Sequence, residues 1–353
     1  MSEVHQNQFQ IRLTADFYDA DGEPKYDDLG LDVLSQAGHV AVGSFDEHRP
    51  IVTSEQIGDA QGVIVLTPQV TAETVIRSDR LLVVGRFGVG YDSVDVAACT
   101  AADVLVTITA GAVNRPVAEA VVTWMLTLTH QVLAKDRLLR TGRWEDRSGY
   151  MGCELRGRTL GVIGLGGIGR EVILLLAGFG MNPPLVYDPF VAPDVLDACG
   201  ARSVALDELL SMADFVSIHC PLNDQTHGLI GPRELGLMQP DAYLINTARG
   251  GIVDEEALYA ALKEHRIAGA AIDCFDNEPV TDPHPLGELD NVVLAPHCIA
   301  WTGELFRDIG RMACQSMLDL SQGRRPHGAI NPELFDRDSF RKKWNRLTGV
   351  DVS

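Results

Sequence analysis

The sequence TLGVIGLGGIGREVILLLAGFGMNPPLVYD, residues 159–188, decides the fold of this chain. A short apolar run, Leu160 to Ile163, is typical of a buried strand and leads into a turn with the spacing Gly-x-Gly-x-x-Gly. An apolar segment long enough for a helix, Ile168 to Phe179, follows, and a second apolar run, Leu185 to Tyr187, ends in Asp188. The order strand, turn, helix, strand and acid is that of a dinucleotide-binding βαβ unit.

The three glycines of this turn have different tasks. Gly164 permits the tight turn, Gly166 lets the backbone approach a pyrophosphate, and Gly169 lets the helix pack closely on the strand. The start of the helix offers unpaired N–H groups and a partial positive charge to phosphate oxygens. A glycine-rich turn without a ligand is the alternative, but the flanking strand, helix and acid favour a nucleotide site.

Asp188 lies nineteen residues after Gly169, close to the spacing expected for the acid that binds the adenosine ribose hydroxyls. Its charge repels a 2′-phosphate, and neither Arg nor Lys follows directly in the segment Asp188-Pro189-Phe190. NAD is therefore the predicted cofactor, in preference to NADP.

The composition is that of a soluble globular protein, with 46% hydrophobic and 22% charged residues. A length of 353 residues suggests about two domains. The formal net charge of −20 disfavours binding to nucleic acid, whose phosphates require Lys and Arg, and to anionic membranes. A small anionic substrate is still compatible with this charge, because a local basic pocket can hold it.

Seven cysteines without a Cys-x-x-Cys pair indicate reduced thiols rather than a disulfide framework or a zinc site, so no metal is expected. The first ten residues, MSEVHQNQFQ, have neither the basic nor the apolar segment of a signal peptide. No apolar run approaches the ~18–20 residues of a membrane span. We therefore expect a cytoplasmic protein.

Short apolar runs alternate with longer amphipathic segments, which predicts an α/β fold of doubly wound, mostly parallel sheets with helices on both faces. Long helices are expected over residues 117–139 and 301–317, and the basic segment 335–353 is expected to be a solvated tail. Strands are expected at residues 9–13, 63–66, 81–84, 160–163, 185–187, 215–219, 242–246, 270–273 and 292–295.

Three chemically distinctive residues follow three successive predicted strands. Arg249 lies in NTARGGIVDE, Glu278 in DCFDNEP and His297 in APHCIAWT. Because the carboxyl ends of parallel strands meet at one edge, where ligands of such sheets bind, we expect these side chains to converge near the cofactor. Each alone has an ordinary structural explanation, but their common placement favours a shared site.

The chemistry of this set is complementary. An arginine binds a carboxylate through two parallel hydrogen bonds, and an imidazole exchanges a proton with a ketone or alcohol oxygen near neutral pH. A carboxylate beside the imidazole fixes its tautomer and favours its protonated form. The set is suited to hydride exchange between a nicotinamide and a 2-oxo or 2-hydroxy acid.

The N-terminal half contains a candidate anion site. The segment GRFGVGYD, residues 85–92, follows a predicted buried strand, and its amides at Val89 and Gly90 are suited to bind a carboxylate, with Arg86 adding charge. An ordinary strand-ending turn is the alternative. Candidates for cofactor contacts follow strands of the nucleotide domain, namely Cys220, Pro221, Thr247, Ala248 and Asp273.

Taken together, these segments resemble the D-isomer-specific 2-hydroxyacid dehydrogenases, whose relatives include D-3-phosphoglycerate dehydrogenase, glyoxylate/hydroxypyruvate reductase and formate dehydrogenase. The similarity runs from about residue 63 to residue 302. It is carried, in the family's order, by RFGVGYDSVDV, PVAEAVV, GLGGIGR, VYDP, HCPL, NTARGGIVDE, DCFDNEP and APH. Glu278 argues against formate dehydrogenase, which pairs its histidine with glutamine.

The resemblance implies two similar Rossmann-like or flavodoxin-like domains. Residues 1–115 and 301–353 would form a substrate domain, and residues 116–300 an NAD-binding domain inserted into it. By motif match, Arg249 binds the substrate, His297 is the acid/base and Glu278 is its partner. The match also implies cofactor contacts at Gly167, Ile168, Asp188, Cys220, Thr247 and Asp273, and carboxylate-binding amides at Val89 and Gly90. Family members are commonly homodimers, and a homodimer paired through the cofactor domains is expected.

The chain departs from the family pattern at Val113, where relatives usually have Asn, and at Ala300, where many have Gly, followed by the bulky Trp301. We expect these residues to reshape the pocket or the nicotinamide edge. The predicted function is NAD-dependent exchange between a small D-2-hydroxy acid and its 2-oxo acid, such as glyoxylate, hydroxypyruvate or a phosphoglycerate-like acid. Two alternatives are an NAD(H)-sensing corepressor-like binding protein and a thiol-sensitive enzyme that uses Cys274 or Cys298.

Overall fold

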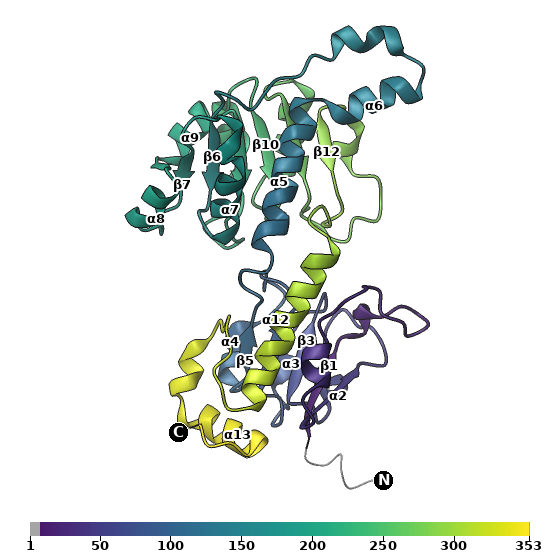
Figure 1. Ribbon diagram of the computed structural model, residues 1–353, viewed down its shortest axis with the longest axis vertical. Helices are drawn as coiled ribbons and strands as arrows, with labels where there is room; N and C mark the ends of the chain where they lie inside the picture. Colours follow the sequence, from purple (N-terminus) through teal and green to yellow (C-terminus); the bar gives the residue numbers. More distant parts are fainter. Residues whose placement is uncertain (1–7, 353) are drawn as a thin grey trace. The chain divides into compact units, whose positions relative to one another are not determined.

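The computed structural model describes residues 8–352; the first seven residues, which hold most of the segment considered for a signal peptide, and Ser353 lie outside the described part. The chain divides into two compact units (Figure 1). Unit 1 comprises Met1–Val113 and Trp301–Ser353, and unit 2 comprises Asn114–Ala300. Unit 2 is thus inserted into the sequence of unit 1.

Unit 2 contains a seven-stranded parallel sheet of order β12-β11-β10-β9-β6-β7-β8. The chain leaves β6 toward β7 and β8, and then returns to the other side of β6 through β9 to β12. In open α/β sheets, ligands bind beyond the carboxyl ends of the strands at such a reversal. The strands are β6 (Leu160–Ile163), β7 (Leu185–Tyr187), β8 (Arg202–Ser203), β9 (Phe215–Ile218), β10 (Tyr243–Asn246), β11 (Gly269–Ile272) and β12 (Val292–Leu294).

Helices cover both faces of this sheet, so neighbouring residues of one strand enter opposite cores. Leu244 packs in the core under α9 (Leu206–Met212), α10 (Pro232–Leu237) and α11 (Glu255–Lys263). Ile245 packs in the other core, which contains side chains of α5 (Asn114–Thr129), α7 (Gly167–Leu176) and α8 (Pro193–Ala198). Burial on both faces explains why these strands read as continuous apolar runs.

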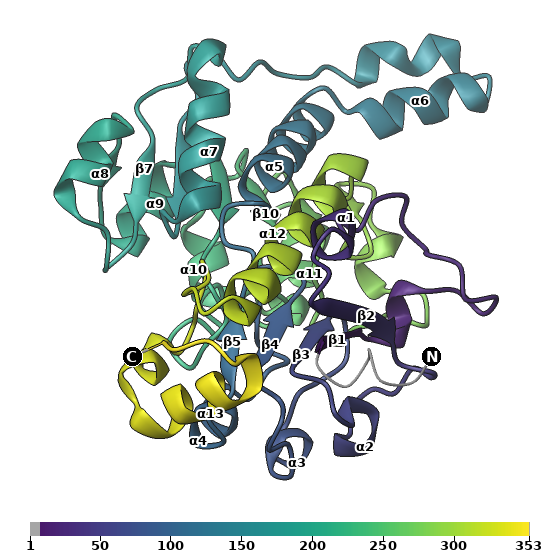
Figure 2. The same cartoon turned by 60° about the horizontal axis from the view of Figure 1, so that its bottom comes forward.

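Unit 1 contains a five-stranded parallel sheet of order β2-β1-β3-β4-β5. The strands are β1 (Phe9–Leu13), β2 (Val40–Ser44), β3 (Gly62–Val65), β4 (Val83–Arg86) and β5 (Leu105–Thr107). Figure 2 shows α12 (Gly303–Ser321) on one side of the sheet, opposite α2 (Ser54–Ile57), α3 (Ala72–Val75) and α4 (Val96–Ala101). The short α1 (Asp32–Ser35) packs against α12. The predicted fold class, with two doubly wound parallel sheets, is confirmed.

Glycine allows α12 to approach this sheet closely. A Cβ on Gly62 would lie 2.7 Å from Met317 Sδ, and a Cβ on Gly85 would lie 2.5 Å from Met317 Cε. Both glycines are therefore needed for the thioether of Met317 to lie directly over β3 and β4.

The prediction of one helix over residues 117–139 is wrong. Two helices, α5 and α6 (Val132–Arg140), meet at an angle of 58°. Gln131 lies between them with φ of +52°, a left-handed conformation that interrupts the helical hydrogen bonds. The apolar period continues across this break, so periodicity alone did not locate it. Within residues 8–352, no single helix is long and apolar enough to cross a membrane, and α5 with α6 pass that test only as a bent pair.

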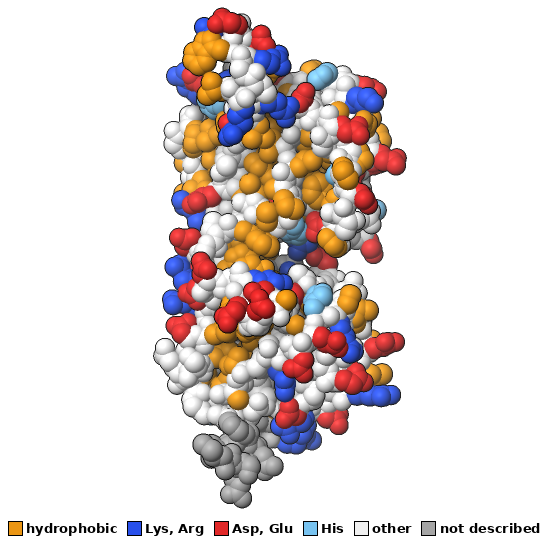
Figure 3. All heavy atoms as spheres, turned by 90° about the vertical axis from the view of Figure 1, so that its right-hand side faces the viewer, with side chains coloured by type: hydrophobic (Ala, Val, Ile, Leu, Met, Phe, Trp, Pro, Cys, Tyr) orange, Lys and Arg blue, Asp and Glu red, His pale blue; other side chains and the backbone are white. Residues whose placement is uncertain are grey.

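Residues 132–151 of unit 2, which include α6 and the 3-10 turn Trp144–Gly149, form an arm that extends from the rest of the unit (Figure 1). Figure 3, which faces the side that carries this arm, shows exposed hydrophobic side chains beside charged ones. The exposed large hydrophobic side chains of the arm are Val132, Leu133, Leu139, Trp144 and Met151.

The expectation of a solvated C-terminal tail is also wrong. Residues Asp338–Thr348 form α13, which buries Phe340 and Trp344 in unit 1. Lys343 Nζ donates to the carbonyls of Ala102 and Asp103, just beyond α4, at 3.1 and 3.0 Å, and burial lowers its pKa to about 8. Basic residues at these positions complement the carbonyl end of α4, so their number does not indicate a free tail.

We expect Trp344→Ala to destabilise unit 1 by about 3–5 kcal/mol, the usual cost of removing a large buried aromatic side chain. The indole Nε1 of Trp344 donates to Leu320 O at 2.7 Å, and its ring packs against Phe335 and Phe340. Urea denaturation followed by circular dichroism would measure the loss, with the exposed Lys342→Ala as the control. Equal midpoints for the two variants would contradict this packing.

Candidate active site

The glycine turn after β6 brings two loops together. Gly164 has φ of +91°, which a side chain rarely adopts, and a Cβ there would lie 2.8 Å from the amide nitrogen of Cys220. A Cβ on Gly169 would lie 2.7 Å from Gly164 O. Gly169 therefore allows α7 to pack against the turn, and Gly164 allows the turn to pack against the loop after β9. Both contacts lie at the point where the strand order reverses.

The N-terminus of α7 fits a phosphate group. A Cβ on Gly166 would meet nothing within 4 Å, so the space beside this residue is open. Gly167 and Ile168 are the first residues of α7, and their amide N–H groups have no acceptor within the helix. Asn114 lies beside them, because a Cβ on Gly167 would be 2.4 Å from Asn114 Nδ2. Val113 departs from the family pattern, but the next residue, Asn114, places a side-chain amide beside the start of α7.

Asp188 follows β7 and is held by the turn it faces. Its Oδ2 accepts from the Leu165 amide at 2.8 Å, and its Oδ1 accepts from the Phe190 amide at 2.8 Å. A carboxylate has further lone pairs beyond these two bonds, so Asp188 can still accept from ribose hydroxyls. The bonds to the turn fix the orientation of the carboxylate.

The loop after β10 is shaped by the side chain of Asn246. Its Oδ1 accepts from the Ala248 amide at 3.0 Å, and its Nδ2 donates to Arg249 O at 2.8 Å. The buried hydroxyl of Thr247 lies in this turn and has no hydrogen-bond partner within residues 8–352. A buried hydroxyl without a partner is unfavourable, so this atom fits a contact with a bound ligand.

The remaining cofactor candidates occupy different surroundings. Cys220 lies against the Gly164 turn, and burial raises the pKa of its thiol to about 11, so it acts as a neutral group. Pro221 is exposed, and its carbonyl accepts from Thr226 Oγ1 at 2.6 Å. The carbonyl of Ala248 accepts from Arg249 Nη1 at 2.7 Å.

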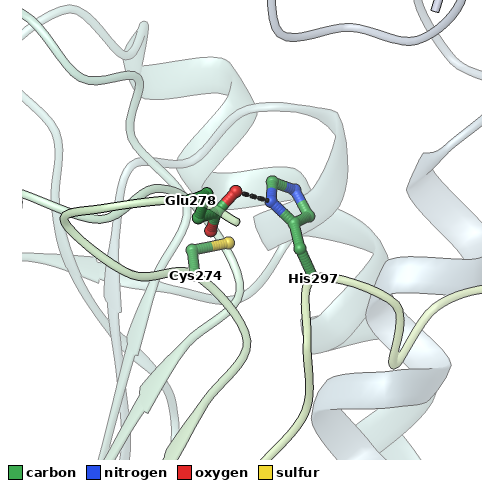
Figure 4. Close-up of side chains that lie close together, drawn as sticks. All are labelled: Cys274, Glu278 and His297. Carbon is green, nitrogen blue, oxygen red and sulfur yellow. Dashed lines mark hydrogen bonds and ion pairs between the residues drawn. The ribbon is translucent and has the colours of Figure 1, made fainter. Parts of the chain in front are cut away.

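His297 and Glu278 form a hydrogen-bonded pair (Figure 4). Nδ1 of His297 lies 2.7 Å from Oε2 of Glu278, and Oε1 of Glu278 accepts from the Phe275 amide at 2.9 Å. Burial opposes the charge on Glu278, but the hydrogen bonds from His297 and Phe275 outweigh it and lower the pKa of the carboxyl. The ionised carboxylate fixes Nδ1 as the protonated nitrogen, which leaves Nε2 to face a ligand.

Asp273 holds the loop that carries His297. Its backbone carbonyl accepts from the His297 amide at 2.8 Å, and its Oδ1 accepts from the amides of Cys298 and Ile299 at 2.9 and 3.2 Å. Within this loop His297 has φ of +52°, a costly conformation for a residue other than glycine. Asp273 is predicted from the sequence to contact the cofactor; its hydrogen bonds to the His297 loop are a positioning role for which the sequence carries no signal.

Arg249 completes the convergence of the three predicted residues. It is half-buried, and its charge contributes to the lowered pKa of Glu278, which places the two groups in electrostatic contact. The loops are close because glycine permits it, since a Cβ on Gly250 would be 2.0 Å from Phe275 O. The predicted convergence of a guanidinium, a carboxylate and an imidazole at one edge of this sheet is present.

Cys274 lies beside the pair with its thiol buried. Burial, with the charges of Asp273 and Glu278, raises the pKa of this thiol far above its usual value. Burial also raises the pKa of the Cys298 thiol. Because thiolates rather than thiols react with oxidants and alkylating agents, both residues are poor candidates for the thiol-sensitive alternative.

The predicted anion site lies at the carboxyl end of β4 in unit 1. Gly88 has φ of +136°, and its carbonyl accepts from the Thr109 amide at 2.9 Å. Within residues 8–352, the amides of Val89 and Gly90 have no hydrogen-bond acceptor, so both can serve an anion. The guanidinium of Arg86 donates to Phe87 O and lies against Gly88.

Unit 1 also holds a buried hydroxyl that the sequence does not indicate and the packing of Trp301, which departs from the family pattern. The buried hydroxyl of Thr109, next to Gly88, has no hydrogen-bond partner among the described residues. Trp301 packs edge-on against Tyr26 and Phe306 with ring centroids 5.9 and 5.1 Å apart. Neither feature is visible in the sequence, because their partners are distant along the chain.

The comparisons with known proteins agree with this architecture. Residues 122–298 match the model of the D-isomer specific 2-hydroxyacid dehydrogenase, NAD binding domain. The chain is 39% identical over 313 residues to a glyoxylate reductase of Thermofilum pendens, covering 87% of this chain and 92% of that protein. A crystal structure of a glyoxylate reductase from Paecilomyes thermophila aligns with a TM-score of 0.78 and 27% identity, over 92% of this chain and 99% of that one.

This chain belongs to the D-isomer-specific 2-hydroxyacid dehydrogenase family, and unit 2 carries the family's NAD-binding domain. The predicted family and the predicted cofactor, NAD, are confirmed. The chain is also 36% identical over 322 residues to the D-3-phosphoglycerate dehydrogenase of Methanocaldococcus jannaschii, covering 91% of this chain but only 60% of that protein. It spans 51% of a second such relative, from Archaeoglobus fulgidus.

We expect Asp188→Asn to reduce the preference for NAD over NADP by about tenfold or more, because a hydrogen bond to a charged group contributes ~1.5–3 kcal/mol. The variant keeps one of the two oxygens that accept from the turn amides and removes the charge that repels a 2′-phosphate. Fluorescence titration with NADH and NADPH would measure the ratio of dissociation constants. The exposed Asp194→Asn on α8 is the control, and an unchanged ratio in Asp188→Asn would show that the acid does not select the cofactor.

Proposed function

We propose that this protein is an NAD-dependent oxidoreductase that interconverts a small D-2-hydroxy acid and its 2-oxo acid. The observation that carries the proposal is the 2.7 Å pair between His297 and Glu278, formed beside Arg249 within the NAD-binding domain of this family. A histidine–carboxylate pair by itself is suited to proton transfer in many different reactions. A guanidinium beside it selects substrates with a carboxylate, which 2-hydroxy and 2-oxo acids share.

In this proposal each residue has a defined task. Arg249 binds the substrate carboxylate and polarises the carbonyl oxygen, and Nε2 of His297 donates a proton to that oxygen in reduction or removes it in oxidation. Glu278 keeps the imidazole in the required tautomer and stabilises its protonated form. By the family resemblance, the amides of Val89 and Gly90, with Arg86, are further candidates for binding a carboxylate. The bound nicotinamide supplies the hydride in reduction and accepts it in oxidation.

Glyoxylate, hydroxypyruvate and phosphoglycerate-like acids are the proposed substrates. The named relatives support this range, because they include glyoxylate reductases and D-3-phosphoglycerate dehydrogenases of 36–39% identity. The net charge of −20 supports a protein that binds neither nucleic acid nor anionic membranes, and unpaired cysteines support a cytoplasmic location.

We also propose that the protein is a homodimer paired through unit 2. The arm of residues 132–151 exposes large hydrophobic side chains, with Leu139, Trp144 and Met151 at 68, 59 and 79% exposure. Several exposed apolar side chains on one projecting segment are typical of a protein interface. A second copy of the chain would cover them.

The test of the proposed function is a panel of 2-oxo acids with NADH, followed by the loss of NADH absorbance. We expect turnover with at least one small 2-oxo acid. In His297→Ala we expect turnover to be abolished, with a decrease in kcat of about 10²- to 10⁴-fold, because the general acid is lost. In Arg249→Ala we also expect turnover to be abolished, because the residue that binds the carboxylate and polarises the carbonyl is lost. Both variants should still bind NADH in a fluorescence titration. Near-normal turnover in His297→Ala would overturn the assignment. NADH-dependent capture of a protein partner, without turnover on any acid, would favour the corepressor-like alternative.

The pH profile tests the role of Glu278. Its lowered pKa keeps the carboxylate ionised throughout the neutral range, where its charge stabilises the protonated imidazole. In Glu278→Gln we expect a lower kcat/KM for reduction, because a neutral amide holds the Nδ1 proton of His297 less firmly than a carboxylate, and we expect the loss of activity on the acid side that comes from protonation of Glu278 to disappear. Glu255→Gln, which removes the acid from the second Glu–His pair of the unit, is the matched control. An unchanged profile in Glu278→Gln would mean that the carboxylate does not act on His297.

A further inference from the structure

Three side chains with metal-binding atoms meet beside the candidate active site. Cys274, Glu278 and His297 each offer one potential ligand atom, and these three atoms lie within 4.8 Å of one another. Figure 4 shows the thiol and the carboxylate approaching each other, with the imidazole hydrogen-bonded to the carboxylate. The cysteine and glutamate follow β11 and the histidine follows β12, so the group depends on strand pairing.

We propose that these three side chains form a site for Zn²⁺ that inhibits the enzyme by engaging its acid/base pair. The inhibition rests on the proposed function, whereas the binding of the metal does not. A thiolate, an imidazole and a carboxylate are the three ligand types that zinc uses in proteins. Mg²⁺ and Ca²⁺ prefer oxygen ligands throughout and are not matched by this set.

The geometry requires only small movements. Zinc bound at ~2.0–2.3 Å in a tetrahedron has ligand atoms about 3.3–3.6 Å apart. Nδ1 of His297 and Oε2 of Glu278, now 2.7 Å apart, would separate by about half an ångström to admit the metal. The Cys274 thiol has a weak contact at 3.5 Å, to Ala248 O, so little is lost when its sulfur turns toward the metal. The fourth position of the tetrahedron remains for water or a substrate oxygen.

The charges around the site suit a divalent cation. Asp273 and Glu278 are the acidic groups that act on the Cys274 thiol, and Arg249 is the neighbouring cation. When zinc replaces the thiol proton, the two carboxylates and the thiolate carry a total charge of −3. The guanidinium and Zn²⁺ carry a total charge of +3, so the local charge sums to zero. The thiol proton passes to solvent, and the imidazole of His297 stays neutral by exchanging its Nδ1 proton for one on Nε2 through solvent.

Inhibition follows from the position of the metal. With zinc on Nδ1, the imidazole can hold a proton only on Nε2 and can no longer form the doubly protonated ring that donates in reduction. Glu278, bound to the metal, no longer orients His297. The sequence spacing gave no indication of this site, because its residues lie at 274, 278 and 297 without a repeated Cys or His motif.

Binding is tested with Co²⁺ and Zn²⁺ on protein first treated with EDTA. Co²⁺ should give tetrahedral absorption bands with a sulfur-to-cobalt charge-transfer band, and calorimetry should give one Zn²⁺ bound per chain. In Cys274→Val we expect loss of the charge-transfer band and at least tenfold weaker binding of Zn²⁺. Cys274→Ser also removes the sulfur but changes the size of the side chain less, so it serves as a second variant if Cys274→Val misfolds. Binding of NADH in a titration would show that each variant is folded. Cys298→Ser, next to His297 but outside the set, should bind both metals normally.

Kinetics provide the second readout, each variant being compared with its own metal-free rate. Zn²⁺ should inhibit the wild type and Cys298→Ser at concentrations near the measured dissociation constant, and Cys274→Val only at tenfold higher concentration. Mg²⁺ should have no effect. Unchanged zinc affinity in Cys274→Val and Cys274→Ser, or activation by Zn²⁺, would overturn the proposal. If no acid is turned over, the cobalt spectrum still decides the metal site; if turnover occurs without metal binding, only this proposal fails.

Discussion

The candidate active site depends on the parallel pairing of β10, β11 and β12. In this register Asn246 pairs with Ile272, and Ile272 pairs with Leu294, so the last residues of the three strands form one row. The chain then continues from each strand into a loop on the same edge. The short loops bring Arg249, Glu278 and His297 together, although they lie at distant positions in the sequence. A shift of register by one residue would turn the strand faces over and separate these loops.

Close approach of backbones holds this edge together. Glycines at positions 164, 169 and 250 lie where a Cβ would come within 2.8 Å of a backbone atom from another part of the chain. Asp273 and Asn246 then tie the loops with side chain to backbone hydrogen bonds. The His297–Glu278 pair therefore stands on loops that the protein's own hydrogen bonds hold in place.

The same crowding gives the site more chemistry than the proposed reaction needs. The buried thiol of Cys274 lies beside the His297–Glu278 pair, where burial and the charges of two carboxylates raise its pKa. This arrangement protects Cys274 from oxidation but leaves a set of sulfur, nitrogen and oxygen ligands for a soft cation. The proposed reaction and the proposed metal site thus use the same two side chains in different ways.

The sequence by itself determined the βα order, the nucleotide turn, the acid after β7 and the three residues that follow β10, β11 and β12, because local patterns of apolar residues, glycine and caps encode them. It did not locate the break at Gln131 or the docking of α13, because an apolar period continues through a bend and a basic helix reads as a solvated segment. The 2.7 Å pair, the loop held by Asp273, the hydroxyl of Thr247 and the position of Cys274 were decided only by tertiary structure. Each of these depends on which strands are neighbours and in what register, and a linear pattern carries no such distance.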